Sequence, residues 1–321
     1  MKILVTGGAG FIGSHTVDAL VASGNHQVSI IDNLSAGKRH QVNPAARFHE
    51  VDIRDADAVR NAIAIETPEV IVHLAAQMDV RRSVADPAFD AQVNIVGFLN
   101  LMEAGRQHGL RRVIFSSTGG AIYGEQEEFP APEDHPLHPV SPYGVAKMAT
   151  EAYLFFYKVQ YGIDYTALRY GNVYGPRQDP HGEAGVVAIF CGRMLEGKPC
   201  TIYGDGKQTR SFCYVSDLIE GILRLLDSQE RLPVNIGNPQ EITILEFAER
   251  VRELTGNRVQ IVFRPLPQDD PKRRCPDIAK ARKLLGWEPK VQLQEGLKLT
   301  LAYFEKRMAE ERAKSGSQRG N

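Results

Sequence analysis

The sequence predicts an α/β protein with a doubly wound parallel sheet, followed by a smaller, discontinuous C-terminal domain that binds a substrate. Through residue 169, short apolar runs alternate with longer segments of helical periodicity, the order expected of parallel strands joined by crossover helices. A glycine-rich turn joins the first run to the first helical segment, as at a nucleotide-binding edge. After Arg169 the chain changes to long glycine- and proline-rich loops, which indicates a second structural unit.

The alternation assigns each element of the first unit in turn. Strands are expected where apolar and β-branched residues cluster, at 2–6, 28–31, 48–51, 70–74, 113–116 and 165–168. Helices are expected where apolar residues recur every three to four positions, at 13–22, 57–65, 89–108 and 143–161.

The second half predicts a chain that leaves the first unit and returns to it. Helices are expected at 186–196, 216–226 and 245–255, and strands at 210–214 and 234–236. We expect residues 1–169 with 213–236 to form the cofactor domain and residues 170–212 with 237–311 the substrate domain. The polar segment 312–321 has the composition of a disordered tail.

The composition of the chain limits the classes of partner and the cellular compartment that we expect. The formal net charge is -1 in 321 residues, so no basic field indicates nucleic acid or an anionic membrane surface. No apolar run approaches the roughly 20 residues of a membrane span. The four cysteines form no CxxC pair and no metal-like spacing with histidine, and the chain starts with a predicted strand and not with a leader. We therefore expect a cytoplasmic protein with reduced cysteines and no metal site.

The first turn has the pattern of a dinucleotide-binding loop. Gly7, Gly10 and Gly13 lie between the strand at 2–6 and the first helix, in a GxxGxxG spacing. Absent side chains let the backbone approach a pyrophosphate, and the helix start offers it N–H groups and a positive dipole end. A purely structural tight turn is the competing interpretation. With Phe11 and Ile12, which open the helix, these glycines are our first cofactor-binding candidates.

Asp32 ends the second strand about 20 residues beyond the loop, where a carboxylate accepts hydrogen bonds from the adenosine ribose. A 2′-phosphate would be repelled there, so NAD is favoured over NADP. Lys38 and Arg39 follow closely and weaken that discrimination. Further cofactor candidates share a position at or just after the carboxyl end of a strand, or on the helix that follows, where ligands bind open α/β sheets. They are Asn33, Ser35, Gly37, Asp52, Ile53, Leu74, Ala75, Ala76, Asn94, Ser116 and Tyr170.

Tyr143 and Lys147 predict the chemistry. An i, i+4 spacing puts both side chains on one face of a helix, where an ammonium group favours ionisation of a neighbouring phenol. Tyr143 is therefore a candidate base near neutral pH. Together with the glycine loop, the pair predicts redox chemistry on a bound nicotinamide. A YxxxK spacing alone is weak, and the glycine loop in the same chain is what supports this interpretation.

The segments GGAGFIG, HLAA, SSTGGAIYG, SPYGVAK and RYGNVYGP, together with Asp32, occur in this order. In these features the chain resembles the extended short-chain dehydrogenase/reductases, in particular the NAD-dependent epimerase/dehydratase family. Within that family it is most similar to the UDP-glucose 4-epimerases. The resemblance covers nearly the whole chain and implies a Rossmann domain with a small C-terminal domain that holds a UDP-sugar.

The resemblance also implies roles for single residues. Tyr143 would be the base, Lys147 its electrostatic partner and a ligand of the nicotinamide ribose, and Thr118 the hydroxyl that hydrogen-bonds the sugar O4. Tyr170 would lie near the nicotinamide. The remaining positions that it matches to substrate-binding residues are Asn172, Val187, Ile202, Tyr203, Arg210, Asp270 and Arg273.

Absent residues distinguish between the reactions of such enzymes. Dehydratases carry an acidic pair after the active-site threonine, whereas Thr118 is followed by two glycines that cannot transfer a proton. UDP-glucuronate decarboxylases carry a glutamate in this segment, which SSTGGAIYG lacks. Asp179 lies where uronate epimerases carry an arginine, and it would repel a substrate carboxylate.

We therefore expect NAD-dependent 4-epimerisation of a UDP-hexose, between UDP-glucose and UDP-galactose, through a transient 4-keto sugar. UDP-glucuronate 4-epimerisation or decarboxylation remains the alternative. A non-enzymatic NAD-sensing protein is less favoured, because Thr118, Tyr143 and Lys147 are all present. The family often dimerises through two helices of each subunit, here 89–108 and 143–161, so a homodimer is also expected.

Overall fold

The computed structural model describes residues 1–180, 185–256, 259–265 and 273–317. A seven-stranded sheet forms its larger unit, with the strand order β10-β6-β5-β4-β1-β2-β3 and every neighbouring pair parallel. The strands are β1 (Lys2–Thr6), β2 (Gln27–Asp32), β3 (Arg47–Glu50), β4 (Val70–His73), β5 (Arg112–Ser116), β6 (Asp164–Arg169) and β10 (Val234–Asn235). The predicted Rossmann-type sheet is confirmed.

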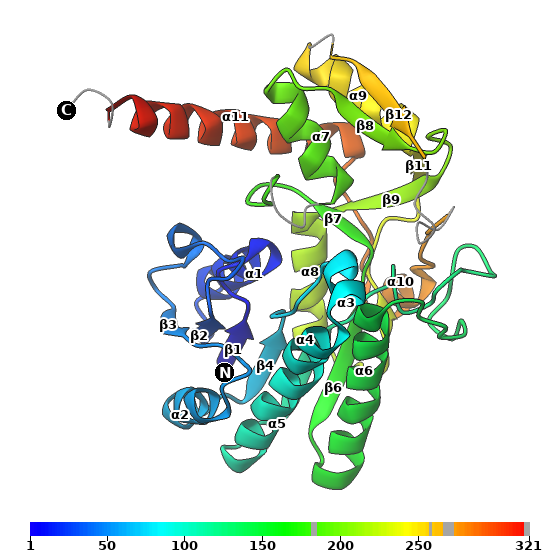
Figure 1. Ribbon diagram of the computed structural model, residues 1–321. Helices are drawn as coiled ribbons and strands as arrows, with labels where there is room; N and C mark the ends of the chain where they lie inside the picture. Colours follow the sequence, from blue (N-terminus) through cyan, green and yellow to red (C-terminus); the bar gives the residue numbers. More distant parts are fainter. Residues whose placement is uncertain (181–184, 257–258, 266–272, 318–321) are drawn as a thin grey trace.

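Helices cover both faces of this sheet (Figure 1). On one face lie α1 (Phe11–Ala22) and α8 (Val215–Asp227), and on the other α2 (Ala56–Glu66), α5 (Gly97–Gln107) and α6 (Pro142–Tyr161). Successive strand residues point to opposite faces, so Ile3 and Val5 of β1 join the core under α1 and α8. Leu4 joins the other core, under α2, α5 and α6. Both faces are buried, which explains why the strands read as continuous apolar runs.

The single helix expected at 89–108 is a composite of three elements in the structure. They are α4 (Pro87–Ala91), a π-helical turn η2 (Gln92–Val96) and α5, and a short helix α3 (Val80–Ala85) that we had not expected precedes them. Asp86 caps α4, because its carboxylate accepts the N–H of Phe89 at 3.0 Å. The π turn interrupts neither the chain's helical path nor its apolar spacing, so periodicity alone could not reveal it.

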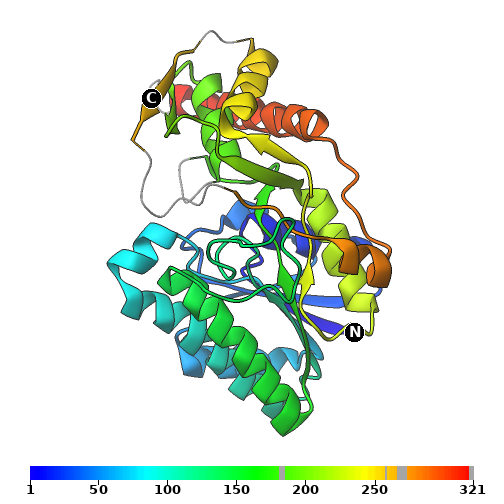
Figure 2. The same cartoon turned by 90° about the vertical axis from the view of Figure 1, so that its right-hand side faces the viewer.

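The smaller unit contains two further sheets. In one, β9 (Thr209–Tyr214) lies between β7 (Asn172–Tyr174) and β11 (Glu241–Thr243), and in the other β8 (Cys200–Tyr203) pairs in parallel with β12 (Ile261–Arg264). Its helices are α7 (Val186–Leu195), α9 (Ile244–Thr255) and α11 (Leu293–Ser317). Figure 2 shows this unit stacked against one end of the larger one.

The chain returns to the larger unit as the sequence predicted, because α8 packs on α1 and β10 pairs with β6. It then returns once more through a helix that we had not expected, α10 (Ala279–Leu285), which packs on α8 and β10. Trp287, just beyond α10, is 1% exposed and donates from Nε1 to the carbonyl of Asp217 at 2.9 Å. The exact domain division stays a prediction.

The disordered tail expected at 312–321 is wrong for its first part, because α11 continues to Ser317. Elongating an existing helix costs little once its first turns are formed, so a polar segment can be helical without apolar spacing. Arg307 also forms ion pairs with Glu310 and Glu311 one turn further on. Residues 318–321 lie outside the described part of the chain.

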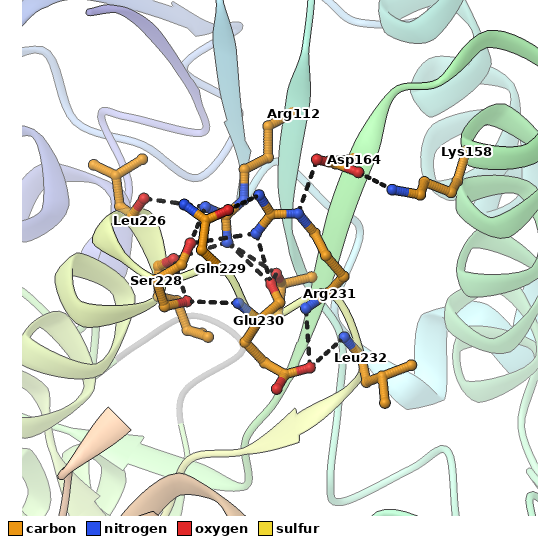
Figure 3. A network of polar contacts seen from close by, with 11 residues as sticks. Arg112, Lys158, Asp164, Leu226, Ser228, Gln229, Glu230, Arg231 and Leu232 are labelled. Carbon is orange, nitrogen blue, oxygen red and sulfur yellow. Dashed lines mark hydrogen bonds and ion pairs between the residues drawn. The ribbon is translucent and has the colours of Figure 1, made fainter. Parts of the chain in front are cut away.

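A buried arginine fixes the end of α8 to the sheet (Figure 3). The Arg112 guanidinium, on β5, donates to the carbonyls of Leu225, Leu226, Ser228 and Glu230 at 2.8–3.2 Å. Carbonyls at a helix end lack intrahelical partners, and a buried cation satisfies them well. This contact holds the segment between α8 and β10 on the sheet, so that β10 can add to its edge.

Candidate active site

The glycine loop between β1 and α1 is as tight as the cofactor prediction requires. Gly7 has a φ of +71°, and a Cβ atom on Gly13 would lie 2.0 Å from the carbonyl oxygen of Gly7. Gly10 is the N-cap residue of α1, and no side chain caps this helix. The helix start is thus left for an anion, so the loop fits the pyrophosphate of a dinucleotide. Phe11 and Ile12 begin α1 and pack with their apolar atoms against the core.

Asp32 lies at the carboxyl end of β2, facing the glycine loop. Its carboxylate accepts the N–H groups of Ala9 at 3.0 Å and Leu34 at 2.8 Å, and burial raises its pKa. Gly37 makes this possible, because a Cβ atom there would lie 2.8 Å from the Asp32 carboxylate. A carboxylate can accept about four hydrogen bonds, so Asp32 can also accept from ribose hydroxyls.

Both cations that follow Asp32 are already matched by carboxylates. Lys38 pairs with Asp179 at 3.3 Å, and Arg39 pairs with Glu50 at 2.6 Å. These exposed pairs reduce the positive potential that a 2′-phosphate would need, which fits NAD. The position of Asp179 also corrects an expectation. Its charge faces the end of β2, so it gives no argument against a uronate substrate.

The ends of β3 and β4 hold the next group of cofactor candidates. Asp52 accepts hydrogen bonds from Arg54 and Asn33, which hold its pKa far below the usual range. Asn33 in turn accepts from Ser35. Ile53 is buried, so close to Gly97 that a Cβ atom there would lie 2.7 Å from it.

Leu74, Ala75 and Ala76 follow β4 directly below the glycine loop. The N–H groups of Leu74 and Ala75 donate to the hydroxyl of Thr6 at 3.2 and 3.1 Å. A Cβ atom on Gly7 would lie 2.8 Å from the Ala75 nitrogen, so this backbone forms one wall of the loop. For all of these residues, contact with the cofactor stays a prediction.

Asn94 lies in the π turn and is 4% exposed. Its side-chain oxygen accepts the N–H of Gln77 at 3.0 Å, and its Nδ2 donates to the carbonyl of Gln77 and to the carboxylate of Asp90. Its own carbonyl accepts the hydroxyl of Thr150 at 3.2 Å, which joins the π turn to α6. Asn94 therefore orders the loop after β4, and its contact with the cofactor stays a prediction.

Tyr143 and Lys147 lie together on α6, as their spacing predicts. Lys147 is 3% exposed, its Nζ lies 5.6 Å from the centroid of the Tyr143 ring, and it donates to the carbonyl of Ser116 at 2.8 Å. Burial lowers the pKa of Lys147 to about 8. At neutral pH the ammonium group is mainly charged, which favours ionisation of the phenol beside it.

Thr118 is 7% exposed in the loop after β5. Its hydroxyl oxygen accepts the N–H groups of Gly120 and Ala121, both at 3.1 Å, so its proton is left for another acceptor. A Cβ atom on Gly144 would lie 2.6 Å from the Ala121 carbonyl oxygen, so the first turn of α6 packs directly on this loop. That contact places the start of α6, which carries Tyr143, against the loop that carries Thr118.

Buried polar groups connect the ends of β5 and β6 to α6. Ser117 donates to Glu151 at 2.5 Å, and Glu151 forms a bidentate ion pair with Arg169, at 2.7 and 3.0 Å. The hydroxyl groups of Ser116 and Tyr170 are hydrogen-bonded to each other, and burial raises the pKa of Tyr170. The ends of β5 and β6 are thereby locked to the middle of α6.

The residues matched to the substrate lie on the smaller unit. Asn172 begins β7 and donates to the carbonyl of Ser211 at 3.3 Å, and Arg210 on β9 is 6% exposed. Val187 on α7 and Ile202 on β8 are buried, whereas Tyr203 at the end of β8 is 39% exposed. Their contact with a nucleotide stays a prediction.

Arg273 and Asp270 complete the predicted set. Arg273 forms a bidentate ion pair with Glu241, at 2.5 and 2.9 Å, and its guanidinium lies 4.4 Å from the centroid of the Phe129 ring. Because Glu241 compensates its charge, Arg273 is less available to bind a nucleotide than the sequence predicted. Asp270 lies outside the described residues.

Arg274, which the predicted set of site residues did not include, borders the loop after Thr118. A Cβ atom on Gly120 would lie 3.4 Å from its guanidinium and 3.7 Å from the hydroxyl of Thr118. The neighbouring Cys275 anchors the segment, because its N–H donates to Gln126 and its carbonyl accepts from Ala131. The glycines after Thr118 therefore both exclude an acid or base and leave room for a cation.

Gln77 and Asp90 are two further residues that we missed. Both are buried at the Asn94 cluster. The i, i+4 pair of Asp90 and Asn94 inside an otherwise apolar helical pattern was a signal for a buried polar cluster.

The described residues, 1–180, 185–256, 259–265 and 273–317, also bear on the wider classes of function. No helix in those parts of the chain is long and apolar enough to cross a membrane. They also contain no group of three or more histidine, cysteine, aspartate or glutamate side chains that could hold a metal ion.

Comparisons with known proteins agree with this geometry. The profile of the NAD dependent epimerase/dehydratase family matches residues 3–237. The crystal structure of the UDP-glucose 4-epimerase of Thermotoga maritima with UDP-glucose superposes with a TM-score of 0.93, at 48% identity, over 96% of this chain and 100% of that one. The corresponding enzyme of Thermus thermophilus, in complex with NAD, gives 0.91 at 45% identity, over 95% and 99%. UDP-glucuronic acid decarboxylase 1 of Danio rerio is 38% identical, over 96% of this chain and 73% of its own length.

Proposed function

The chain belongs to the NAD-dependent epimerase/dehydratase family, and we propose that within it the chain is a UDP-hexose 4-epimerase with NAD as its resident cofactor. The observation that carries this proposal is the site at which α6, with Tyr143 and Lys147, packs on the loop that carries Thr118. It holds a base, a buried cation and a hydroxyl group, and the residues after Thr118 are glycines. Such a site can oxidise and reduce a sugar carbon, but it lacks the acidic pair that elimination requires. The substrates that we propose are UDP-glucose and UDP-galactose.

The chain's own residues manage the proton and the position of the sugar. NAD, held by the glycine loop and Asp32, would supply reversible hydride transfer at C4 of the sugar. Tyr143, as phenolate, takes the proton of the C4 hydroxyl group and gives it back when the carbon is reduced. Lys147 stabilises the phenolate through its charge, and Thr118 donates its free proton to the sugar oxygen. The sugar must turn over between the two steps, so the substrate has to be held mainly by its nucleotide.

The smaller unit supplies side chains of the right kinds to hold that nucleotide. Arg210 would bind the diphosphate, and Val187, Ile202 and Tyr203 would enclose the uridine. Asn172 begins the strand beside β9, close enough to donate to the carbonyl of Ser211. Strong contacts to the nucleotide and weak contacts to the hexose let binding energy anchor the substrate without fixing the face of C4.

Incubation with UDP-glucose tests the proposed function. We expect NAD-loaded protein to convert UDP-glucose to an equilibrium mixture with UDP-galactose, with no net reduction of NAD, because the hydride returns to the substrate. NMR of the anomeric protons measures both sugars in one sample. Absence of UDP-galactose from folded, NAD-loaded protein would contradict the proposal.

A specific observation keeps a second candidate open, which is a UDP-glucuronate 4-epimerase or decarboxylase. Arg274 and Thr118 both border Gly120, and a guanidinium there can pair a uronate carboxylate. The same NMR experiment with UDP-glucuronate distinguishes the candidates. Formation of UDP-galacturonate, or release of carbon dioxide, with no turnover of UDP-glucose would replace the first candidate by the second. The presence of Thr118, Tyr143 and Lys147 disfavours the non-enzymatic alternative.

We also propose a homodimer in which α5 and α6 of each subunit form a four-helix contact. The outer surface of α6 and the π turn before α5 carries large apolar side chains that are 39–70% exposed. They are Val96, Val145, Tyr153, Phe155, Phe156, Val159 and Tyr161. A second copy would bury this patch symmetrically. The four cysteines are free thiols, in keeping with the cytoplasmic location that we propose.

Replacing Val159 with aspartate is expected to convert the dimer to a monomer. Val159 is 70% exposed, so the change costs the subunit little, whereas the contact would bury an unpaired charge. Light scattering after size exclusion measures the mass. Leu299→Asp, on α11 and 48% exposed, is the matched control and should stay dimeric. A monomeric wild-type protein at micromolar concentration would contradict the proposed contact.

A further inference from the structure

Asp90 is a carboxylate buried against the catalytic helix, and the chemistry described above does not use it. It lies on α4 and is 1% exposed, and α4 packs against α6, which carries Tyr143 and Lys147. A buried carboxylate is costly unless its charge is compensated or it is protonated. Such a residue in a site with a buried lysine therefore needs an explanation.

Only half of this carboxylate is satisfied by hydrogen bonds. Oδ1 accepts from Gln77 Nε2 and Asn94 Nδ2, both at 3.0 Å. Oδ2 is buried without a hydrogen-bond partner among the described residues. Asp90 also forms no ion pair within 4 Å with any lysine, arginine or histidine in those parts of the chain. The two donors fix the orientation of the group, and neither neutralises it.

Lys147 is a buried cation that needs a negative charge nearby. Its ammonium group is buried, and its hydrogen bond goes to a neutral carbonyl, that of Ser116. The carboxylates that act on its charge are Asp90, from α4, and Glu151, one turn further along α6. Glu151 is already paired with Arg169 through a bidentate contact. Its charge is therefore largely compensated, and Asp90 is the anion left to balance Lys147.

The other groups facing Lys147 do not provide a counter-charge. His73, on β4, is fully buried, and burial lowers its pKa to about 3, so it is neutral. Its Nδ1 lies 2.7 Å from the Thr6 hydroxyl. Tyr143 is the group whose ionisation Lys147 serves. On α3, which also packs on α6, Arg81 and Arg82 are exposed cations.

We propose that Asp90 is a positioning residue of this site, whose carboxylate, oriented by Gln77 and Asn94, is the counter-charge that keeps Lys147 protonated beneath Tyr143. The inference rests on the proposed roles of Tyr143 and Lys147 but not on which UDP-sugar is the substrate. The two charges interact through buried protein, where little solvent screens them. The π turn contributes by placing Asn94 where its side chain reaches Asp90 while its carbonyl reaches Thr150 on α6.

Asp90→Asn removes the charge and can keep both hydrogen bonds, because an amide oxygen can accept from Gln77 and Asn94. We expect the alkaline limb of the kcat profile to move to lower pH by about one unit, since an opposite charge nearby shifts a pKa by one or more units. The direction follows from the lysine: without its anion it loses its proton at lower pH, and the phenolate then loses its stabilising charge.

A second readout does not depend on turnover. Ultraviolet difference titration of the NAD-loaded protein, with the Tyr143→Phe signal subtracted, reports the phenolate directly. We expect Asp90→Asn to show several-fold less phenolate at pH 7.5 than wild type. Failure of the proposed function on UDP-glucose would leave this titration unaffected, so the two failures are distinguishable.

Asp86→Asn is the matched control, with the same change of charge four residues earlier on the same helix. Asp86 is exposed and caps α4, and asparagine caps equally well, so both profiles should match wild type. A lower kcat for Asp90→Asn with an unmoved alkaline limb and an unchanged phenolate titration would mean a structural role only, and would overturn the proposal.

Lys147→Met supplies a measurement that does not require the Asp90→Asn protein to fold. Burial already raises the pKa of Asp90, and removing the cation should raise it further above its unfolded value, so the stability associated with Asp90 is lost as pH rises. As pH rises from 5 to 7, the urea midpoint of Lys147→Met should therefore decrease more than the urea midpoint of the wild type. An equal pH dependence in both proteins would overturn the proposed pairing.

Discussion

Replacing Tyr143 with phenylalanine is expected to lower kcat by about 1,000-fold, within the range of 10²–10⁴ that a positioned base contributes. The change removes the oxygen that we propose takes the proton of the C4 hydroxyl group, and the two residues after Thr118 cannot replace it. Gly119 and Gly120 follow Thr118. Lys147 donates to the Ser116 carbonyl and is mainly protonated at neutral pH. Steady-state turnover of UDP-glucose, measured by NMR or by coupled oxidation of UDP-galactose, gives the ratio.

Substrate binding should survive this change. The ring can stay in place, and the nucleotide is proposed to bind on the smaller unit. The dissociation constant for UDP-sugar, measured by calorimetry, should therefore change less than about threefold. Tyr153→Phe, on the same helix and 39% exposed, is the control and should leave turnover unchanged. If Tyr143→Phe keeps more than a tenth of wild-type kcat, Tyr143 is not the base.

The second large effect is expected at Gly13, where alanine should lower the affinity for NAD by about 100-fold. Its Cβ atom would lie 2.0 Å from the carbonyl oxygen of Gly7 and 2.9 Å from the Cα of Gly8. Both are backbone atoms, so no side chain can move aside and the loop itself must open. Overpacking of this kind costs about 3 kcal/mol, which corresponds to the stated loss.

Gly10→Ala provides a graded comparison within the same loop. Its Cβ atom would lie 3.2 Å from the same carbonyl oxygen, which a small shift can relieve. We expect a smaller loss of NAD, measured as cofactor released per subunit on denaturation, together with a smaller fall in the melting temperature. Equal cofactor content in both variants would show that the close approach at Gly13 does not control binding.

Most elements could be predicted because their signals are local. The strand at 2–6 and the helix at 186–196 appear in the structure within one residue of the expected bounds. Apolar spacing and strand length are properties of a few consecutive residues, so they can be read without knowing the fold. The short helices α3 and α10 were missed because six or seven residues carry too little periodicity. The composite helix of α4, the π turn and α5 was wrong in detail because a π turn keeps the apolar pattern.

The positions of several candidate site residues in the fold were predictable to a similar degree. Gly7, Gly10, Gly13 and the Tyr143–Lys147 pair lie as expected, because each group interacts within one or two turns of backbone. Predictions that depended on the course of a loop were less accurate. Asp179 was expected to face the sugar and instead pairs with Lys38, because a loop's course depends on what it packs against.

The sequence by itself determined the fold class, the glycine loop and the placement of Tyr143 and Lys147 on one helix face. Those properties depend on spacing along the chain, which the backbone converts directly into geometry. Only the tertiary structure decided which charges meet. Asp90 lies against the helix of Lys147, Arg274 reaches Gly120, and Glu151 is held by Arg169. These partners come from distant segments, and their interactions depend on burial and on exact packing. Since a buried charge is governed by its few nearest neighbours, the protonation of this site could be explained only after those neighbours were known.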